Sequence, residues 1–542
     1  MSTTLPPKGD ASVAGASQPD RITDHDLLGG GDSDGKPEVE HHSGDVTSAA
    51  ELTPEELELE KKLKKKIDTL IMPLVVLVYL MNYIDRNNYA AARLQGLETD
   101  LNLSDSQYQL GLSILFVGYI LAQVPSNMLL NYMGRPSLYL GLFTMLWGSV
   151  SALTSLVKSF GQIVACRFIL GMVEAPFFPG VLFYLSKWYT KSELNLRMSI
   201  FYSGSLISGA FGNLIAGGIL SGLGNSHGLS PWQWLYIIEG VITVAVGFLL
   251  IFVLPDFPDT WKGLSPELKQ IANRRLAIEA AQADVDEAGG MSQLKGFKLA
   301  MMDPCTYVLA LSYMCATGTA GFQNFFPTLT STFVAGDDRV KALLLCAPPY
   351  LFITVGSLVH SVFSDRVGNR FWFYMYPIPL RNVPRVTIVG FLIFMFVDDS
   401  NFGAKYFSLF LMVVVFNMNG TTYAWIANAI PRPPAKRAAA FAFINSIGNS
   451  ASIWTPFTYR QKDFPSYKLA MGINIGLQAV AAVCGVLMWY ILTSRNKQLE
   501  RMENEDSELS GKDLAVLQKT ADLAGVDIAT ARRQQKGYRY MI

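Results

Sequence analysis

The chain is 542 residues long; half of its residues are apolar, only 16% are charged, and 44 basic residues balance 44 acidic ones. This composition excludes the strongly basic surface that nucleic-acid binding needs, and it is typical of a polytopic membrane protein rather than of several soluble domains. The five cysteines stand singly, without the paired spacing of a zinc site, so we expect neither a disulfide nor a metal.

The first segment, residues 1–60, is rich in Gly, Ser, Asp and Pro and has few large apolar side chains. Such a segment cannot bury a core, so it is predicted to be a disordered tail. It lacks the basic and then apolar pattern of a signal peptide. A cluster of lysines follows directly before the first apolar run: Lys61, Lys62, Lys64, Lys65 and Lys66. By the positive-inside rule this end of the chain is expected to be cytosolic.

Apolar runs of about 20 residues then recur along the chain, the length that a helix needs to cross a bilayer. Six lie near residues 68–91, 108–130, 136–157, 161–186, 198–222 and 233–254, and six more near 306–333, 342–364, 371–398, 404–428, 437–458 and 469–493. The sequence therefore predicts an all-α polytopic membrane protein with twelve transmembrane helices in two six-helix halves. The halves are residues 61–254 and 305–494, with a cytosolic loop at 255–304 and a cytosolic tail at 495–542.

The ninth of these runs is the weakest, because Arg381, Arg385 and several prolines interrupt it. Only residues 386–397 are continuously apolar. We expect this span to be kinked or tilted, unless an error in the gene model produced it.

Two loops at corresponding places in the halves are similar to each other. "SVFSDRVGNR" (361–370) follows the eighth span and "NMLLNYMGRP" (127–136) follows the second, so that Gly368 aligns with Gly134. Both resemble the loop signature of the major facilitator superfamily, in which two six-helix halves alternate access to a central site. The resemblance implies gating loops that contain Gly134, Arg135, Asp365, Arg366, Gly368 and Arg370. A generic tight turn with basic residues is the alternative.

Charges inside the apolar runs are the main functional candidates, because a charge in mid-bilayer is costly. In "CRFILGMVEAPFFPG", Arg167 and Glu174 are seven residues apart, on nearly the same helix face and about 10 Å apart along the axis. They are too distant to pair directly, and Asp85 and Arg86 on the first span are the expected partners. The four charges either form a site whose proton affinity depends on a bound anion or a fixed ion-pair network.

A closer resemblance rests on "YIDRNNYAAARLQGLETDL", "GYILAQVPSNMLLNYMGRPSLY" and "NAIPRPPAKRAAAFAFINSIGNSASI". Over roughly residues 70–490 the chain looks like the anion:cation symporter family, in its fungal allantoate and vitamin permease branch. The resemblance implies that Asp85 and Glu174 carry protons and that Arg86 binds the carboxylate of a substrate. It also implies that Arg167 pairs with the first-helix acid. Gln233 departs from the family, which often has Arg there.

Weaker candidates for substrate binding are Tyr119 and Gln123 on the second span, Asn324 in the glycine-rich seventh and Asn445 in the eleventh. Each has an ordinary packing or interhelical hydrogen bond as its alternative. Asn102, in the sequon Asn-Leu-Ser of an outside loop, is a candidate for glycosylation. Glu239 lies near the start of the sixth span, where an interfacial structural acid is one reading and its role stays open.

These features favour a proton-coupled symporter of a small organic anion in a plasma membrane, working as a monomer without a cofactor. The main alternative is an exporter of the same fold. Against it, Gly209 is followed by Ala210, where proton antiporters of this fold have a Gly-Pro pair. A channel or receptor would not need the two-half organisation with buried acids and arginines. An enzyme is disfavoured because no metalloprotease, serine hydrolase or phosphate-loop motif is present.

Overall fold

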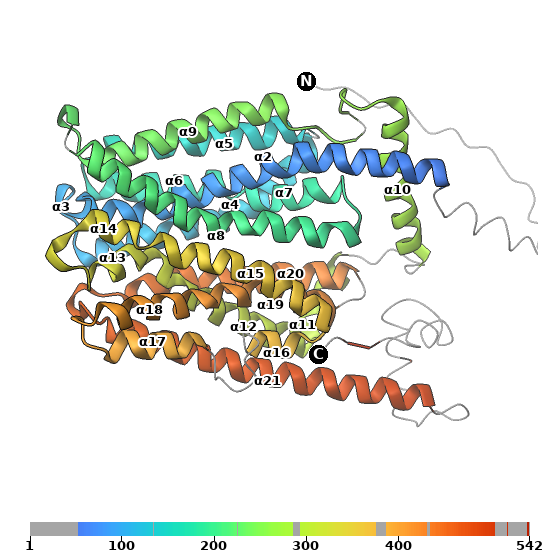
Figure 1. Cartoon of the computed structure of the whole chain (residues 1–542). Helices are drawn as coiled ribbons and strands as arrows, with labels where there is room; N and C mark the ends of the chain where they lie inside the picture. Colours follow the sequence, from blue (N-terminus) through green and yellow to red (C-terminus); the bar gives the residue numbers. More distant parts are fainter. Residues whose placement is uncertain are drawn as a thin grey trace, which may run out of the picture. The chain divides into compact units, whose positions relative to one another are not determined.

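The computed structural model describes residues 53–504, except 134, 225, 259, 286–292, 376–385 and 431–433, and also residues 518, 539 and 540. Within these ranges every regular element is a helix (Figure 1). The predicted tail at residues 1–52 and most of the chain after residue 504 lie outside the described part.

The helices of the first half run in the order of the six predicted spans. They are α2 (Pro54–Leu94), α3 (Leu97–Asp100), α4 (Asp105–Met133), α5 (Pro136–Leu153), η1 (Thr154–Leu156), α6 (Phe160–Glu174), α7 (Phe177–Ser186), α8 (Lys191–Gly222), η2 (Ser226–Gly228) and α9 (Pro231–Val253). Two further helices, α10 (Pro266–Val285) and α11 (Gln293–Met302), lie in the connection to the second half.

The helices of the second half are interrupted more often than those of the first half. Its elements are α12 (Pro304–Ala320), η3 (Gly321–Phe325), α13 (Phe326–Ser331), η4 (Ala335–Asp337), α14 (Arg339–Leu344), α15 (Ala347–Val367), α16 (Arg370–Met375), α17 (Val386–Phe396), α18 (Phe402–Met412), η5 (Val413–Val415), α19 (Phe416–Ala429), α20 (Pro434–Trp454), η6 (Thr455–Thr458), η7 (Gln461–Asp463) and α21 (Lys468–Asn504).

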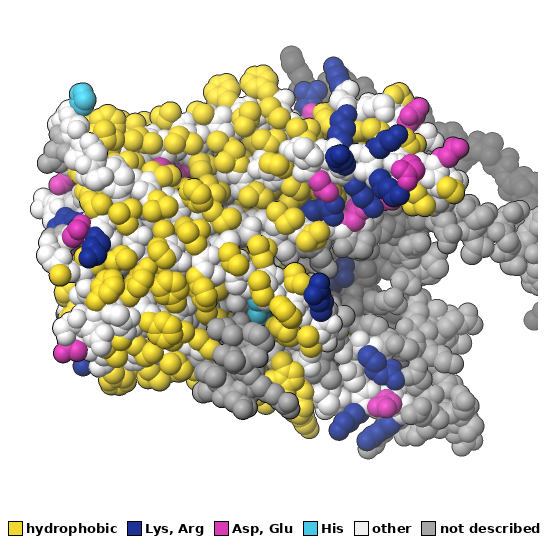
Figure 2. Space-filling model, in the orientation of Figure 1, with side chains coloured by type: hydrophobic (Ala, Val, Ile, Leu, Met, Phe, Trp, Pro, Cys, Tyr) yellow, Lys and Arg dark blue, Asp and Glu magenta, His cyan; other side chains and the backbone are white. Residues whose placement is uncertain are grey.

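Described helices occupy each of the twelve predicted spans, which confirms the all-α polytopic fold. Among the described residues, eight helices are individually long and apolar enough to cross a membrane, and the pair α11 and α12, bent by 79°, adds a ninth. Figure 2 shows apolar side chains over the middle of the visible face and Lys and Arg gathered toward one end. We call this the lysine-rich end, after residues 61–66, and the other the opposite end.

The first and last described long helices extend past two of the predicted domain limits. Thr53 and Glu56 form a reciprocal capping box and Pro54 takes the first helical position, so α2 starts there and not after residue 60. The first span and the charged segment before it are one helix of 41 residues. At the other end of the chain, α21 continues to Asn504 and passes the predicted boundary at residue 494.

Glycines bring neighbouring helices of the first half into backbone contact. A Cβ built on Gly171 of α6 would lie 2.0 Å from the carbonyl oxygen of Leu115 on α4. A Cβ on Gly240 of α9 would lie 2.7 Å from the carbonyl oxygen of Gly148 on α5. Small residues at such crossings are typical of membrane helix packing. They hold α6, which carries Arg167 and Glu174, against α4, and α9, which carries Glu239, against α5.

Hydrogen bonds between the two halves gather at the opposite end. Arg93 of α2 donates to the side chain of Gln461 (3.3 Å), and the backbone N–H of Gln461 donates to Asp105 (2.8 Å). Gln109 of α4 donates to the carbonyl oxygen of Tyr459 (2.8 Å). We call these five residues the opposite-end seal, because they join α2 and α4 to the connection between α20 and α21.

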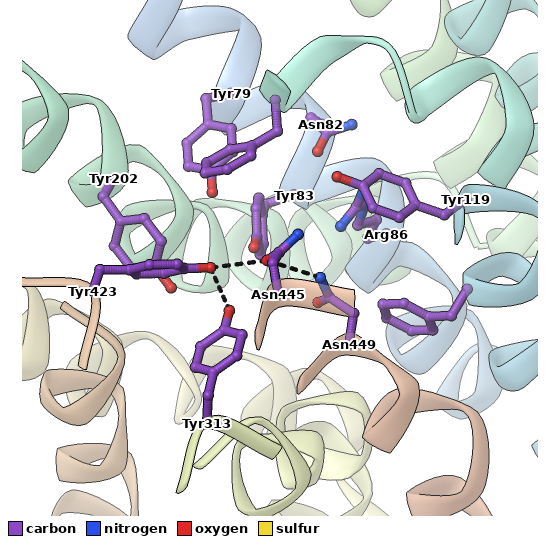
Figure 3. Close-up of a pocket in the computed structure, with 12 residues that line it drawn as sticks. Tyr79, Asn82, Tyr83, Arg86, Tyr119, Tyr202, Tyr313, Tyr423, Asn445 and Asn449 are labelled. Atoms are coloured by element: carbon purple, nitrogen blue, oxygen red, sulfur yellow. Dashed lines mark hydrogen bonds between the residues drawn. The ribbon is translucent and has the colours of Figure 1, made fainter. Parts of the chain in front are cut away.

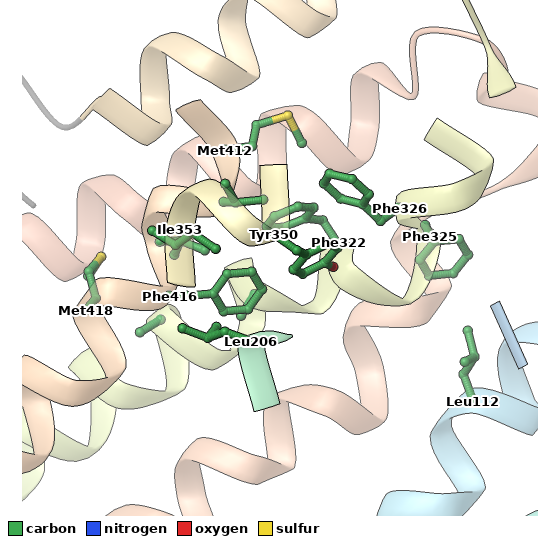
Figure 4. Close-up of a cluster of buried hydrophobic side chains, with 14 of the residues drawn as sticks. Leu112, Leu206, Phe322, Phe325, Phe326, Tyr350, Ile353, Met412, Phe416 and Met418 are labelled. Atoms are coloured by element: carbon green, nitrogen blue, oxygen red, sulfur yellow. The ribbon is translucent and has the colours of Figure 1, made fainter. Parts of the chain in front are cut away.

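The seventh span is interrupted, as its glycine-rich sequence predicts, because η3 separates α12 from α13. Its aromatic residues nevertheless face a hydrophobic cluster (Figure 4). Phe322 lies 5.7 Å from Phe326 and 5.9 Å from Phe416, and Phe326 lies 4.9 Å from Tyr350, measured between ring centroids. The interruption therefore fills the core of the second half with aromatic rings.

The ninth span is divided in the way its sequence suggests. The helices α16 and α17 flank residues 376–385, which lie outside the described residues together with Arg381 and Arg385. The described part of α17 is a short apolar helix.

Candidate functional site

A cavity lies between the two halves, with a volume of about 490 Å³ including its open mouth (Figure 3). Side chains from α2, α4, α7 and α8 line it on one side, and side chains from α12, α19 and α20 on the other. They are Tyr79, Asn82, Tyr83, Arg86, Phe116, Tyr119, Phe178, Tyr202, Tyr313, Tyr423, Asn445 and Asn449.

The second half contributes a hydrogen-bonded chain of neutral polar groups to this cavity. The hydroxyls of Tyr313 and Tyr423 are 2.5 Å apart, and the Tyr423 hydroxyl donates to Oδ1 of Asn445 (3.1 Å). Asn449 donates to the same oxygen (3.1 Å). These contacts fix the side chains against one another (Figure 3), so the cavity wall on this side is preorganised.

Arg86 is the charged residue of the cavity lining. Its Nε donates to Oε2 of Glu174 at 2.6 Å, and the Glu174 side chain is fully buried. The guanidinium also lies over the rings of Tyr119 (4.8 Å) and Tyr83 (5.5 Å), a cation–π arrangement. Oε1 of Glu174 has no hydrogen-bond partner among the described residues. The cation facing the cavity is thus held by one buried carboxylate and two rings.

Asp85, the residue before Arg86, faces the interior of the first half and does not line the cavity. Its carboxylate is fully buried and accepts hydrogen bonds from Ser151 of α5 (2.8 Å) and Thr243 of α9 (3.0 Å). Asn88, one turn along α2, donates at 3.5 Å. Successive residues of a helix point about 100° apart, so α2 presents these two charges to different environments.

Arg167 takes a position that the resemblance does not imply. Its Nε donates to the carbonyl oxygen of Gly111 on α4 (3.2 Å), and its guanidinium lies 4.6 Å from the centre of the Tyr89 ring. The side chain is buried and is not among the cavity-lining residues. Of the expected partnerships, the structure brings Arg86 and Glu174 together, whereas the described partners of Asp85 are neutral.

Some of the weaker candidates line the cavity and others do not. Tyr119 and Asn445 line the cavity. Gln123, on α4 one turn beyond Tyr119, and Asn324, in η3, are half-buried and are not among the lining residues. Asn102 is exposed in the turn after α3, at a backbone φ of +48°.

The predicted gating loops are described only in part. Gly134 and the side chain of Asp365 lie outside the described residues, and Arg135 is exposed directly before α5. Gly368 ends α15 with φ +66°, the left-handed conformation that favours glycine, and Arg370 donates to the Ser364 hydroxyl at 2.7 Å. Arg366 is exposed in the last turn of α15.

Most of the tyrosines were missed by the sequence reasoning. Tyr79 and Tyr83 are one helical turn apart and share the face of Arg86, a spacing that could have indicated a polar stripe on the first span. Tyr202, Tyr313 and Tyr423 lie on three other helices and had no such signal. Among the described residues, no group of three His, Cys, Asp or Glu side chains could hold a metal ion.

Comparison with protein families gives one match over most of the chain. The family described as Major Facilitator Superfamily matches residues 75–456. The chain is 31% identical to the MFS-type transporter cnsO of Penicillium expansum over 450 residues, covering 81% of this chain and 84% of the relative. It is 30% identical to the major facilitator-type transporter hxnP of Emericella nidulans, covering 82% and 88%.

Solved structures show the same fold at low sequence identity. A bacterial homologue of the human lysosomal transporter Spinster, inward-facing and unoccupied, matches with a TM-score of 0.60 and 15% identity, covering 82% of this chain and 99% of that one. A D-xylose–proton symporter matches with a TM-score of 0.57 and 14% identity, covering 78% and 97%.

Proposed function

Because this chain belongs to the Major Facilitator Superfamily and is a membrane transporter rather than an enzyme, we propose that it is a secondary active transporter which moves a small organic anion together with protons. The observation that carries the proposal is Arg86, a guanidinium on the wall of a cavity between the halves whose described acidic partner is the buried Glu174. Guanidinium binds carboxylate through two parallel hydrogen bonds, and it stays charged at any physiological pH.

The pairing of Arg86 with Glu174 provides a reason for coupling. A substrate carboxylate that binds Arg86 competes with Glu174 for the same cation. Protonation of Glu174 removes its negative charge and frees the guanidinium, so anion and proton favour each other's binding. Movement of the pair also avoids carrying an uncompensated charge through the low-dielectric interior.

The finer assignment, to the anion:cation symporter family and its allantoate and vitamin permease branch, is part of the same proposal. The motifs around "YIDRNN" and "NAIPRPPAKRAAAF" support it. We assign substrate contacts to Arg86, Tyr119 and Asn445, proton binding to Glu174 and Asp85, and supporting roles to the residues outside the cavity lining: Gln123, Arg167, Asn324 and the loop residues Arg135, Asp365, Arg366, Gly368 and Arg370, with Gly134.

The transport cycle follows from this assignment. The halves, residues 61–254 and 305–494, would rock about the cavity in a monomer of the plasma membrane, with the lysine-rich end in the cytosol. In the described structure, the opposite-end seal joins the two halves at the other end, and we propose that it closes the path there.

The test is uptake of a panel of labelled carboxylates by cells that lack their own permeases, at an acidic and a neutral pH. We expect acid-stimulated uptake of at least one carboxylate, and its loss in Glu174→Gln and Asp85→Asn. Glu267→Gln, the same chemical change at an exposed position of α10, is the matched control. Uptake that keeps its pH dependence in both variants would refute the proton roles, and no acid-stimulated uptake at all would favour an exporter.

A further inference from the structure

Glu239 on α9 is a buried acid that the proposed transport site does not use. Its side chain is 2% exposed, and both carboxyl oxygens are without a hydrogen-bond partner among the described residues. Glu239 is therefore buried in the interior of the protein, and its role, which the sequence leaves open, needs an explanation. A buried polar group of this kind is costly unless it has a function or is neutral.

A second acid, Asp85, and an arginine, Arg167, lie in the surroundings of Glu239, and the arginine is bound to other groups. From α2, Asp85 and Asn88 lie close enough to interact with it electrostatically. From its own helix, Tyr236 lies near both acids, and its hydroxyl also has no partner among the described residues. The positive charge of Arg167 on α6 interacts electrostatically with Tyr236. The guanidinium itself, however, donates to the carbonyl oxygen of Gly111 and lies over a tyrosine ring.

The hydroxyls of the neighbouring helices are directed to Asp85. Ser151 of α5 and Thr243 of α9 each donate to one oxygen of that carboxylate. An ionised carboxylate in a low-dielectric interior needs such donors, but no hydroxyl donates to Glu239 in the described part of the chain, and the Asn88 amide that lies near Glu239 donates to Asp85. Glu174 of α6 also lies near enough to act on Asp85, but its own charge is paired with Arg86. The asymmetry fits one ionised acid, Asp85, beside one neutral acid, Glu239.

Helix packing keeps the two acids together. The helix α9 packs against both α2 and α5. The residue after Glu239, Gly240, touches the backbone of Gly148 and Ala152 on α5, so α9 cannot move away from the hydroxyl of Ser151 without breaking that contact. Two carboxyl groups held near each other in a buried site cannot both be ionised without a large repulsion.

We propose that Glu239 and Asp85 form a buried carboxyl pair that binds one proton, which rests on Glu239 when Asp85 is ionised, and that Glu239 is a third proton-coupling residue of the transporter. This inference rests on the proposed proton coupling and adds a group to it. The hydroxyls of Ser151 and Thr243 donate hydrogens to Asp85, the acid of the pair that is taken to be ionised, and donors of this kind suit a proton site better than a metal cation.

Infrared difference spectroscopy of the purified full-length chain over a pH series tests the pair without a substrate. We expect a carboxylic acid C=O band that is present at low pH, disappears as the pH rises and is missing in Glu239→Gln. Glu267→Gln should keep the band. A Glu239 band that persists at every pH would mean a permanently neutral structural acid, and its absence at every pH would mean a permanently ionised one; each result overturns the proposal.

Asp85→Asn is the test of coupling within the pair. Removing the neighbouring negative charge makes ionisation of Glu239 easier, so its band should disappear at lower pH than in the wild type. An unchanged titration would overturn the pair. Loss of the band on adding sodium at constant pH would also overturn it, in favour of a sodium site. If Glu239→Gln does not fold, Glu239→Asp keeps a titratable group and should shift the band without abolishing it.

Transport measurements distinguish a failure of this inference from a failure of the proposed function. If the wild type shows no acid-stimulated uptake, the proposed function fails, and the infrared titration still decides the carboxyl pair. If uptake is found, Glu239→Gln should keep exchange of the same labelled carboxylate across the membrane but lose its acid-driven accumulation. Retained accumulation would overturn the coupling role of Glu239.

Discussion

At the scale of single residues, the partners of each charge decide what it can do. Arg86 and Arg167 are both arginines inside apolar helices. The guanidinium of Arg86 donates to the carboxylate of Glu174 and also faces the cavity. The guanidinium of Arg167 instead donates to a backbone carbonyl oxygen and lies over the ring of Tyr89. The first can exchange one anion for another, and the second has no anion to exchange among its described partners.

This difference makes Arg86→Lys a sharp test at the cavity. Lysine keeps the positive charge but loses the planar fork and much of the contact with Tyr119 and Tyr83. We expect the KM for the transported carboxylate to rise about tenfold or more, which corresponds to about 1.4 kcal/mol. Uptake kinetics measure it, with Arg274→Lys, an ion pair of α10 away from the cavity, as the control. An unchanged KM would remove Arg86 from the substrate contacts.

At the scale of helices, the contact of α5 with α9 is the tightest constraint near the buried acids. A Cβ at Gly240 would lie 2.6 Å from the backbone nitrogen of Ala152, and backbone atoms cannot yield as a flexible side chain can. The contact therefore determines how close α5, with Ser151, lies to α9, with Thr243, the two helices whose hydroxyls donate to Asp85.

We expect Gly240→Ala to destabilise the protein by about 1–3 kcal/mol, because the added methyl group forces the two helices apart. Thermal unfolding of the detergent-purified protein measures the loss. The control is Gly218→Ala on α8, where a Cβ meets no atom within 4 Å. Equal stability of the two variants would mean that α5 and α9 can separate without cost.

A second helix-scale feature lies between α11 and α12, outside the apolar segments. Asp303 caps α12 and accepts hydrogen bonds from Lys436 (2.7 Å) and Arg495 (2.9 Å), so it ties α12 to α20 and α21. Burial acts to raise the pKa of Asp303, but the positive charges of Lys436 and Arg495 outweigh it and hold the pKa below its ordinary value.

A lowered pKa in the folded state means that Asp303 stabilises the fold above its unfolded pKa and stops doing so as the pH falls through its folded value. We expect Asp303→Asn to cost about 2 kcal/mol at neutral pH, because the partner cations are partly exposed. In thermal unfolding, the gap to the wild type should close in acid below the folded pKa. A gap that is independent of pH would contradict the ionic role.

At the scale of the whole molecule, the opposite-end seal is the set of hydrogen bonds that joins the two halves away from the lysine-rich end. Its hydrogen bonds join the halves and must break before the cavity can open on that side. Each contributes about 1 kcal/mol, so a few of them suffice to set the balance between two states.

Replacing both Gln109 and Gln461 by alanine removes two of these bonds, about 2 kcal/mol, and should therefore raise the population open at the opposite end about thirtyfold. Modification of Asn449→Cys by a membrane-impermeant thiol reagent, added from that side, measures the opening. Gln233→Ala is the control, since Gln233 bonds to the carbonyl oxygen of Ser155 within one half. Equal labelling in the double variant and the control would show that the seal does not limit opening.

The sequence was sufficient for the spans and for the four buried charges, because hydropathy and charge are properties of a local segment. It could not say which arginine faces the cavity, since that depends on Gly111 of α4 and on the ring of Tyr89, which come close only in the folded bundle. The same holds for Tyr313 and Tyr423, whose contact joins distant parts of the chain. Glu239 was left without a role because its neighbour Asp85 is far away in sequence.

The adjacency of Asp85 and Arg86 on α2 has a consequence for how ions could be exchanged. The two side chains point about 100° apart around the helix axis, Asp85 toward the buried hydroxyls of Ser151 and Thr243 and Arg86 toward the cavity. Helix α2 thus lies between the buried carboxylate of Asp85 and the substrate cavity. Rotation of α2 about its axis would change the surroundings of Asp85 and Arg86 at the same time. A proton at Asp85 and an anion at Arg86 would then affect each other without a chain of intermediate residues.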